Sequence, residues 1–282
     1  MQKFKGYDQL ESIVMHLDSA ELRDVYVQVP STDGKVHVAK TKRFKAIYNI
    51  DRNRVEAIMS DKYTLVQHRD AFFPLLQAVQ TIPADIFGFV TDEGGKVYID
   101  VLFDSEEYKI EPEDGKPINI GLRASNTYDG TGAFIVRAFG YRSYCDNGMV
   151  FGKKTIASAY QIHRGAVSLD VFRSILEELK KFVPMLKETI NSAIQDSLEF
   201  AQVSEVLKAL DIGKRTRINI LSRTLTKTDK DGKISRWELY NTLTDYITHD
   251  LEKKKELTRE KYHEKAELLL ATPVQKLIGG NQ

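Results

Sequence analysis

A change in the spacing of apolar residues near residue 166 constrains the fold of this chain more than any other feature. Before it, apolar residues alternate with polar ones in short runs that turn residues separate, which is typical of β-hairpins. After it, they recur three and four positions apart, as one stripe of a helix does. The sequence therefore predicts an α+β fold, with an antiparallel, hairpin-rich N-terminal half packed on helices and a helical C-terminal half. The stripe consists of Phe172, Ile175, Leu179, Phe182, Leu186, Ile190 and Ile194.

Turns that contain glycine divide the first half into three predicted hairpins. Asp33-Gly34, Gly94-Gly95 and Asp129-Gly130 each lie between two runs of extended character, and Asp-Gly in that position indicates a hairpin turn. A helix is expected at 69–79, where apolar residues follow helical spacing. The expected strands are 24–29, 35–39, 44–50, 63–66, 86–90, 97–103, 118–125 and 133–144.

The second half is expected to be helical and to form a region of its own. Pro184 lies inside the apolar stripe, so a kink or break is expected near Val183. The predicted division is a β-rich core with short helices over 1–165 and a helical region over 166–282. The helical region is expected to pack on the core and to end in an exposed helix rich in Glu and Lys. The helices expected after the stripe are 203–210, 217–225, 236–248 and 250–270.

Composition and charge narrow the classes of partner and compartment. The formal net charge is +1, so a site for a polyanion has to come from a local patch. The single cysteine, Cys145, forms no internal disulfide, which is typical of a cytoplasmic protein. No apolar run approaches the ~20 residues that a membrane-spanning helix needs, and residues 1–10 carry no signal-peptide pattern. We therefore expect a cytoplasmic chain without a membrane partner.

The segment 121–165 is the strongest candidate for a nucleic-acid-binding surface. It contains six lysines and arginines against two aspartates, with aromatic residues between them. In an extended strand Arg137, Phe139 and Tyr141 point to one face, and such a face can bind phosphate and stack a base. The alternative is a sheet face in which the aromatic residues are core and Arg137 forms a salt bridge. The predicted nucleic-acid-binding residues are Arg123, Arg137, Tyr141, Arg142, Lys153, Lys154 and Arg164.

Short polar side chains near two hairpin ends define a candidate pocket. If these ends converge, the chain is an enzyme of an unrecognised kind. Against this, Asn-Gly and Asp-Gly are also ordinary turn chemistry, and we identify no catalytic motif. A lone cysteine beside a strand end is typical of a small packed hydrophobe. The candidate pocket residues are Asn126, Tyr128, Asp129, Cys145, Asp146 and Asn147.

One loop resembles a calcium-binding loop without matching it. Asp229, Asp231 and Glu238 fall at the third, fifth and twelfth positions of such a loop. The first position is Lys227, and a cation there repels the metal. The alternative is a polar turn that starts a helix, with Ser235 as N-cap and Glu238 three residues later.

The segment 148–155 resembles a phosphate-binding loop, but three residues instead of four separate its glycines. The geometry of backbone amides around a phosphate depends on that spacing. The six histidines show no metal-ligand spacing with a nearby cysteine or pair of acids. No metal and no cofactor is therefore expected.

Three stretches together resemble the phage/plasmid-like protein family, which is widely described as a domain of unknown function. The first is the run 57–63, which ends in Ser-Asp-Lys-Tyr, and the third surrounds Trp237. The second contains the run Cys-Asp-Asn-Gly-Met at 145–149, the most specific element, and the resemblance covers roughly residues 40–250. The second and third stretches rest on Ser125, Asn126, Tyr128, Asp129, Gly130, Arg142, Cys145, Asn147, Trp237, Leu239, Tyr240, Asn241, Thr244 and Tyr246.

This resemblance implies a setting on phages, plasmids or their integrated remnants, with a role in replication, recombination or host takeover. It supplies no set of catalytic residues. The order of strands and helices is also similar to that of the single-strand annealing proteins of phages, an analogy of fold. That analogy implies oligomerisation and a basic groove.

Three hypotheses of function follow. The first is a nucleic-acid-binding accessory protein of a mobile genetic element, related to single-strand annealing, replication or recombination. Its expected partners are single-stranded DNA or RNA, replication or recombination proteins, and further copies of the chain. The second is a protein–protein interaction module that acts through the charged helix 250–270. The third is the unrecognised enzyme, with its pocket near Asn126 and Asn147.

Overall fold

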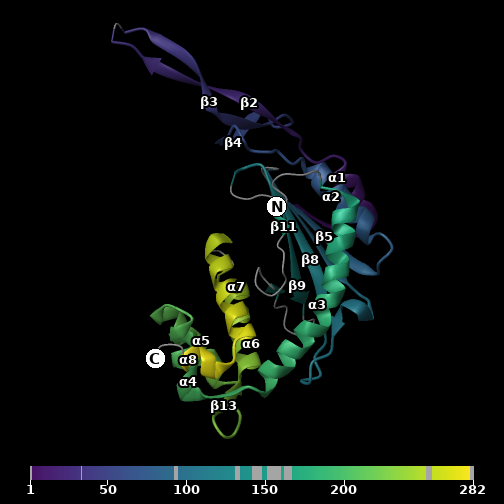
Figure 1. Ribbon diagram of the computed structural model, residues 1–282, viewed down its shortest axis with the longest axis vertical. Coiled ribbons are helices and arrows are strands. Elements are labelled where there is room, and N and C mark those ends of the chain that lie inside the picture. The colour runs from purple at the N-terminus through teal and green to yellow at the C-terminus, as the bar shows by residue number, and fades with distance from the viewer. Residues whose placement is uncertain are drawn as a thin grey trace. The chain divides into compact units, whose positions relative to one another are not determined.

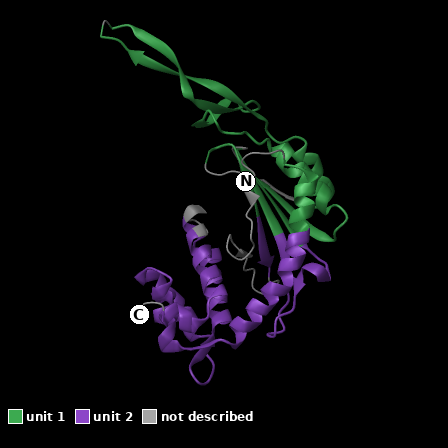
Figure 2. Ribbon diagram, viewed as in Figure 1, with its two compact units in different colours: residues 1–102, 122–136, 160–176 green, residues 103–121, 137–159, 177–282 purple. Residues whose placement is uncertain are grey.

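The computed structural model describes residues 2–32, 34–91, 95–130, 134–141, 148–150, 160–161, 167–251 and 256–279. It confirms the α+β class, with antiparallel sheets built mostly from the first half of the chain and helices from the second (Figure 1). The chain forms two compact units, each assembled from separated stretches (Figure 2). Unit 1 comprises Met1–Leu102, Leu122–Val136 and Tyr160–Leu176, and unit 2 comprises Phe103–Gly121, Arg137–Ala159 and Glu177–Gln282.

The largest sheet has the strand order β1-β5-β6-β8-β9-β10, with β7 beside β8 and β11 beside β9. The second and third predicted hairpins are confirmed, because β5 and β6 are neighbours in this order, and so are β8 and β9. Its strands are β1 (Gln2–Lys5), β5 (Ala84–Val90), β6 (Lys96–Phe103), β7 (Lys109–Ile110), β8 (Ile118–Thr127), β9 (Ile135–Tyr141), β10 (Gly148–Val150) and β11 (Tyr160–Gln161).

The first predicted hairpin is confirmed as β2 (Ala20–Pro30) and β3 (Val36–Asn49), and both strands are longer than predicted. With β4 (Arg54–Ser60) they form a second antiparallel sheet in the order β2-β3-β4. Gly34 lies in the turn with a φ of 79°, a left-handed conformation that glycine adopts without a Cβ clash. The strand β4 pairs only with residues 44–49 of β3. Beyond that point β2 and β3 continue as a two-stranded ribbon (Figure 1).

The strand expected at 63–66 is wrong. These residues follow β4 as irregular chain. Tyr63 and Leu65 pack instead against a buried cluster of Ala20, Ile47 and Tyr128. The apolar alternation there reflects burial of alternate side chains of a loop, and it does not indicate pairing with a neighbouring strand.

Two helices of unit 1 cover its apolar core. They are α1 (Tyr7–Val14), which was not predicted, and α2 (His68–Val79), which confirms the helix expected at 69–79. The ring of Phe134, just before β9, meets Phe72 of α2 and Phe172 of α3. The centroid distances are 5.9 and 6.1 Å and both pairs are T-shaped, a favoured aromatic geometry.

Helix α3 (Leu169–Gln195) carries the predicted apolar stripe. From Phe172 to Ile190 every stripe residue is buried, and Ile194 is half-buried. The helix runs through Pro184 without a break, so of the predicted kink or break near Val183 the break is wrong and the kink stays a prediction. Pro184 is exposed, and water can therefore satisfy the carbonyl that loses its backbone donor there.

The other helices of the described chain confirm those expected between residues 203 and 270 and add α8 at the end. A short antiparallel pair, β12 with β13, joins the start of α4 to the start of α6. These elements are η1 (Glu106–Tyr108), β12 (Ser197–Glu199), α4 (Phe200–Ala209), α5 (Lys214–Leu225), β13 (Lys233–Ser235), α6 (Arg236–His249), α7 (Glu256–Ala271) and α8 (Val274–Gly279).

The C-terminal charged helix is not exposed along its whole length, contrary to expectation. Ala266, Leu269 and Leu270 of α7 are buried. Arg236 at the start of α6 is 2% exposed and donates hydrogen bonds to the carbonyls of Leu269 and Leu270. Its Nε also donates to the carboxylate of Asp196 at 2.8 Å. Arg236 thereby satisfies carbonyls that the last turn of a helix leaves without a donor.

Two expectations concern the chain as a whole. The predicted boundary near residue 165 falls outside the described residues and stays a prediction. Among the helices that the structure describes, none is both long enough and apolar enough to cross a membrane.

Candidate functional site

The strand predicted to bind nucleic acid through one face is β9, and its side chains alternate as expected. Val136 and Ala138 are buried on one face, whereas Arg137 and Tyr141 are half-buried on the other. Phe139 lies between those two and is 8% exposed, so little of its ring is accessible to a base. Nucleic-acid binding by this face stays a prediction.

Arg123 on β8 is engaged by a carboxylate on the neighbouring strand β6. Its Nε and Nη2 donate to the two carboxylate oxygens of Asp100, each at 2.6 Å, which makes a bidentate pair. Asp100 is 7% exposed, whereas the side chain of Arg123 is 46% exposed. A phosphate would therefore compete with Asp100 for this guanidinium group.

Most of the remaining predicted site residues lie outside the described residues. Arg123, Arg137 and Tyr141 are the described members of the predicted nucleic-acid-binding set, and Asn126, Tyr128 and Asp129 are those of the candidate pocket. The members outside are Arg142, Cys145, Asp146, Asn147, Lys153, Lys154 and Arg164.

Asn126 is buried in unit 1 and holds a histidine in place. Its Nδ2 donates to the carbonyl of Val66 at 2.9 Å and lies 3.0 Å from Nδ1 of His68. Because a carbonyl only accepts, the Asn126 amide presents its NH2 group on this side, and Nδ1 of His68 accepts from it. The neutral imidazole then carries its proton on Nε2. Asn126 and His68 are 2% and 0% exposed, so this pair belongs to the core.

Tyr128 completes the same buried network. Its hydroxyl accepts a hydrogen bond from the backbone N–H of His68 at 3.0 Å and lies within donating distance of the Asp18 carbonyl and the Gln67 Oε1. The Tyr128 and His68 rings stack with centroids 3.8 Å apart. Burial raises the pKa of the Tyr128 hydroxyl, so it stays protonated. This side chain ties the chain before β2 and the start of α2 to β8.

The turn after Tyr128 packs closely against β4. Gly130 has a φ of 72°, and a Cβ there would lie 3.1 Å from Ala57 Cβ and Met59 Sδ. Asp129 forms an ion pair with Lys96 at 3.1 Å. The side chains of Asn126 and Tyr128 are thus enclosed by protein. A pocket that these residues share with Cys145, Asp146 and Asn147 stays a prediction.

The third stretch of the family resemblance lies on α6 and is core. Trp237 and Tyr240 are each 1% exposed, and their rings stack at 5.3 Å. The Trp237 Nε1 donates to the carboxylate of Asp114 at 3.0 Å. Asn241 and Thr244 are buried beside them. These residues therefore belong to the core of unit 2 and do not form an accessible surface.

The loop that resembles a calcium site is a polar turn, as the alternative reading predicted. Ser235 caps α6 and accepts from the Glu238 N–H at 3.1 Å. Asp229 accepts from two backbone N–H groups, those of Asp231 and Lys233, at 3.0 and 2.8 Å. The Asp229 carboxylate thus holds the turn, and the backbone N–H of Glu238 is capped by Ser235. In the described part of the chain no three His, Cys, Asp or Glu side chains gather in a group that could hold a metal ion.

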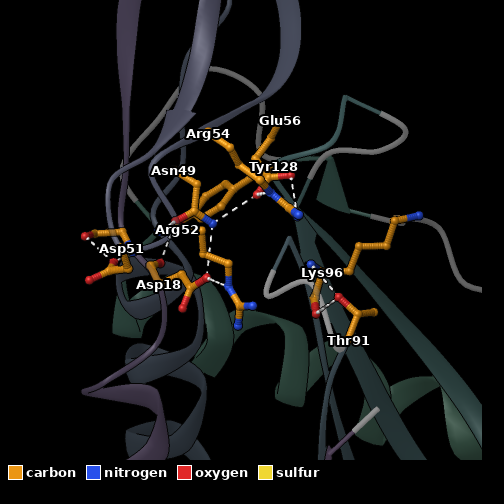
Figure 3. A network of polar contacts seen from close by, with 10 residues as sticks. Asp18, Asn49, Asp51, Arg52, Arg54, Glu56, Thr91, Lys96 and Tyr128 are labelled. Carbon is orange, nitrogen blue, oxygen red and sulfur yellow. Dashed lines mark hydrogen bonds and ion pairs between the residues drawn. The ribbon is translucent and has the colours of Figure 1, made fainter.

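A polar network that the sequence analysis missed connects the chain before β2 to the end of β3 and the start of β4 (Figure 3). Asp18 accepts from Asn49 at 3.0 Å and from Arg52 at 2.7 Å, and Glu56 accepts from Asn49 at 3.1 Å and from Arg54 at 2.9 Å. Asn49 is 0% exposed and bridges two ion pairs. The charge of each arginine is therefore matched by a carboxylate. An open depression beside the network is lined by Asp18, Asp51, Arg52 and Arg54.

A second missed feature is the two-stranded ribbon at the ends of β2 and β3. We call residues 26–40 the arm. Every described residue of the arm except Ser31 is exposed, so no element that the structure describes backs it. Tyr26 lies opposite Lys40 and Pro30 opposite Val36 across the ribbon. Tyr26 and Val38 are 60% and 64% exposed. Two-stranded ribbons gain little stability alone, and exposed apolar side chains in such numbers mark an interaction surface.

The third missed feature is a run of positive charge on β3. Residues 35–45, which we call the basic segment, contain no acidic residue. Asp24 on β2 forms ion pairs with two of its lysines, Lys40 and Lys45, at 2.5 Å each. These lysines hold the pKa of the Asp24 carboxyl below its usual range. The five cations of the basic segment are Lys35, Lys40, Lys42, Arg43 and Lys45.

Two cations of the basic segment project from an irregular stretch of β3. Asp24 lies opposite Lys45 and Tyr26 opposite Lys40, so between these two pairs β2 has one residue, Val25, and β3 has four, 41–44. Such a bulge leaves residues outside the strand ladder and changes the direction of their side chains. Lys42 and Arg43 lie in it and are exposed. Within the part of the chain that the structure describes, neither forms an ion pair.

These features were visible in part from the sequence. The basic segment can be read directly from the letters, but its significance depends on the exposure of both faces of the ribbon. The polar network offers no local signal, because Tyr128 and Asp18 are 110 residues apart.

Comparison with known proteins gives one match. A family model described as a domain of unknown function (DUF932) matches residues 56–270, which includes all three stretches of the sequence resemblance. No curated protein and no solved structure matches the chain. The arm lies before the matched residues.

Proposed function

The chain belongs to the DUF932 family, whose function is unknown, and we propose that it is a nucleic-acid-binding accessory protein of a mobile genetic element. The setting on phages or plasmids comes from the resemblance of the three stretches. Within that setting, single-strand annealing, replication and recombination all require a protein that holds a nucleic-acid strand. The proposed ligand is single-stranded DNA or RNA, and the proposed site is the basic segment of β3.

One observation carries this proposal: Lys42 and Arg43 are exposed cations without an ion pair in the described chain, in a segment of five cations. Phosphate contacts supply most of the affinity of a protein that binds nucleic acid without sequence preference. Lys40 and Lys45 share the carboxylate of Asp24, so one negative charge opposes these two lysines. The segment therefore keeps a local positive field although the chain is nearly neutral.

Exposed aromatic rings beside these cations favour a single strand over a duplex. Tyr26 lies opposite Lys40 and is 60% exposed, and Phe44 follows Arg43 and is 49% exposed. A base stacks on such a ring only when it is unpaired, and each stacked base contributes about 1–3 kcal/mol. Cations and exposed rings thus lie side by side on the two strands of the ribbon, which suits a ligand that presents both phosphates and unpaired bases.

The test is the affinity of the wild-type chain for labelled oligonucleotides of one length, single-stranded and duplex, as DNA and as RNA. We expect tighter binding to the single strands at low salt. The double variant Lys42→Ala/Arg43→Ala should bind more weakly. The control is Lys181→Ala/Lys187→Ala, which removes the same charge from exposed positions on α3 and should bind like the wild type. Absence of binding by the folded wild type at low salt would refute the proposal.

The ring contribution is tested separately with Tyr26→Ala. This variant should lose affinity for single strands by the stacking energy of about one base, 1–3 kcal/mol, and keep its thermal stability, because Tyr26 is exposed. An equal loss of affinity for duplex would show that Tyr26 does not stack on unpaired bases.

A further inference from the structure

The outer edge of β2 has no neighbouring strand among the described residues. The sheet order is β2-β3-β4, so β2 pairs on one side only, over the eleven residues from Ala20 to Pro30. Backbone N–H and C=O groups on its other side are open to a further strand. Proteins usually protect such an edge with charged side chains, most often lysine, with a bulge or with a covering element.

The last part of this edge, which follows the bulge between Asp24 and Tyr26, lacks protecting charges. Residues 25–30 read Val-Tyr-Val-Gln-Val-Pro and carry no charge. They have high β-propensity, and Pro30 ends the run at the tip of the ribbon. Of the fourteen large apolar side chains that are exposed among the described residues, nine lie between Tyr26 and Ile58, in the β2–β4 sheet and its connections. Such a concentration on one small sheet indicates a surface that another protein covers.

The distribution of charge indicates which protein covers it. If residues 25–30 of β2 pair antiparallel with the same residues of a second copy, only apolar and amide side chains lie opposite one another. No two like charges then face each other across the pair. The edge of β3 differs, because pairing it with itself brings two basic segments together. Pairing of β2 with β3 of another copy would be head-to-tail and would leave a β2 edge free to pair with a further copy, whereas β2 with β2 uses both of these edges and closes around a two-fold axis.

We propose that the chain forms a dimer in which β2 edges of two copies pair antiparallel over residues 25–30. The pairing makes a four-stranded ribbon from two arms and supplies the further strands that a two-stranded ribbon needs for stability. The two basic segments then lie along the outer strands. The dimer does not depend on the proposed function, since its contacts are backbone hydrogen bonds and apolar side chains.

The test is the mass of the nucleic-acid-free chain in solution, measured by sedimentation over a range of concentrations. The wild type is expected to have the mass of two chains. Val27→Lys puts a charged side chain of each copy into the uncharged run that pairs, and a lysine on an edge strand opposes edge-to-edge pairing, so this variant is expected to have the mass of one chain. Val38→Lys is the control, because Val38 is exposed on β3, 64% against 43% for Val27, and it is expected to stay a dimer.

Three results would overturn the dimer. They are a wild type that stays a monomer at every concentration, a Val27→Lys variant that stays a dimer, and a Val38→Lys variant that dissociates as readily as Val27→Lys. Both variants replace exposed side chains, and unchanged circular dichroism confirms that each is folded. The Lys42→Ala/Arg43→Ala variant is expected to remain a dimer. Loss of nucleic-acid binding and loss of the dimer are therefore separate outcomes.

Discussion

Arg123 on β8 donates two hydrogen bonds of 2.6 Å to the carboxylate of Asp100 on the neighbouring strand β6. The carboxylate is nearly buried and the guanidinium is half-exposed. An arginine that looks available in the sequence thus has its charge matched by an acid 23 residues earlier. Lys42 and Arg43, which the sequence analysis passed over, have no such partner in the described chain.

Arg123→Ala should lower the free energy of unfolding by about 1–3 kcal/mol, because it leaves the Asp100 carboxylate without its donors. Arg123→Lys should recover only part of this, since an ammonium group lacks the bidentate geometry. Chemical denaturation measures both. Unchanged stability together with lost affinity for single strands would instead place Arg123 in the nucleic-acid site.

Tyr128→Phe should cost about 1–3 kcal/mol, because the buried N–H of His68 loses its acceptor. Tyr108→Phe is a matched control. Tyr108 is equally buried, but its hydroxyl has no hydrogen-bond partner within the described residues. Removal of that hydroxyl should change the free energy of unfolding little or raise it. Equal losses in the two variants would show that the network around Tyr128 adds no stability.

Leu179→Ala should lower the free energy of unfolding by about 2–5 kcal/mol, because it opens a cavity beneath α3. Leu179 is 1% exposed, whereas Met185 on the same helix is 63% exposed. Met185→Ala should therefore stay within about 0.5 kcal/mol of the wild type. Urea denaturation of both variants compares the two sides of one helix, and a loss at Leu179 below half a kcal/mol would contradict its place in the core.

Asp24→Asn should tighten binding to single-stranded nucleic acid, because it releases Lys40 and Lys45 from the shared carboxylate. Those lysines lower the pKa of Asp24, so the carboxyl protonates, and the pairs are lost, only as the pH falls below the usual aspartate range. Between pH 5 and 8 the affinity of the wild type should not change through Asp24. A weaker-binding Asp24→Asn would show that the basic segment does not contact the ligand.

Local patterns predicted many elements of the fold, although not α1 or β4. The stripe from Phe172 to Ile190 and the Asp33-Gly34 turn each contain their own signal, period in one case and turn chemistry in the other. A break at Pro184 did not occur, and that residue faces solvent, where water can satisfy the carbonyl that loses its donor. The strand expected at 63–66 failed because alternate burial also arises in a loop that packs on a core cluster.

The candidate site was less accessible to sequence reasoning. The sequence analysis treated the pair Arg137 and Tyr141 as a surface, but exposure depends on which other elements cover a strand face. The arm presents the opposite case. Valines are typical of a core, but those of the arm are exposed because no other element of the described chain packs against them. Contacts between residues far apart in the sequence, such as the hydrogen bond between Tyr128 and Asp18, cannot be recognised from the spacing of neighbouring residues.

The most direct test of the proposed site is the slope of log affinity against log salt for a single-stranded oligonucleotide. Each phosphate neutralised on a single strand contributes about −0.7 to that slope. Lys42→Ala/Arg43→Ala should therefore flatten it by about one unit or slightly more. Lys153→Ala/Lys154→Ala, in the segment first predicted to bind, serves as the comparison and should leave the slope near that of the wild type. A slope that the Lys42 and Arg43 changes leave intact and the Lys153 and Lys154 changes flatten would contradict binding through the basic segment.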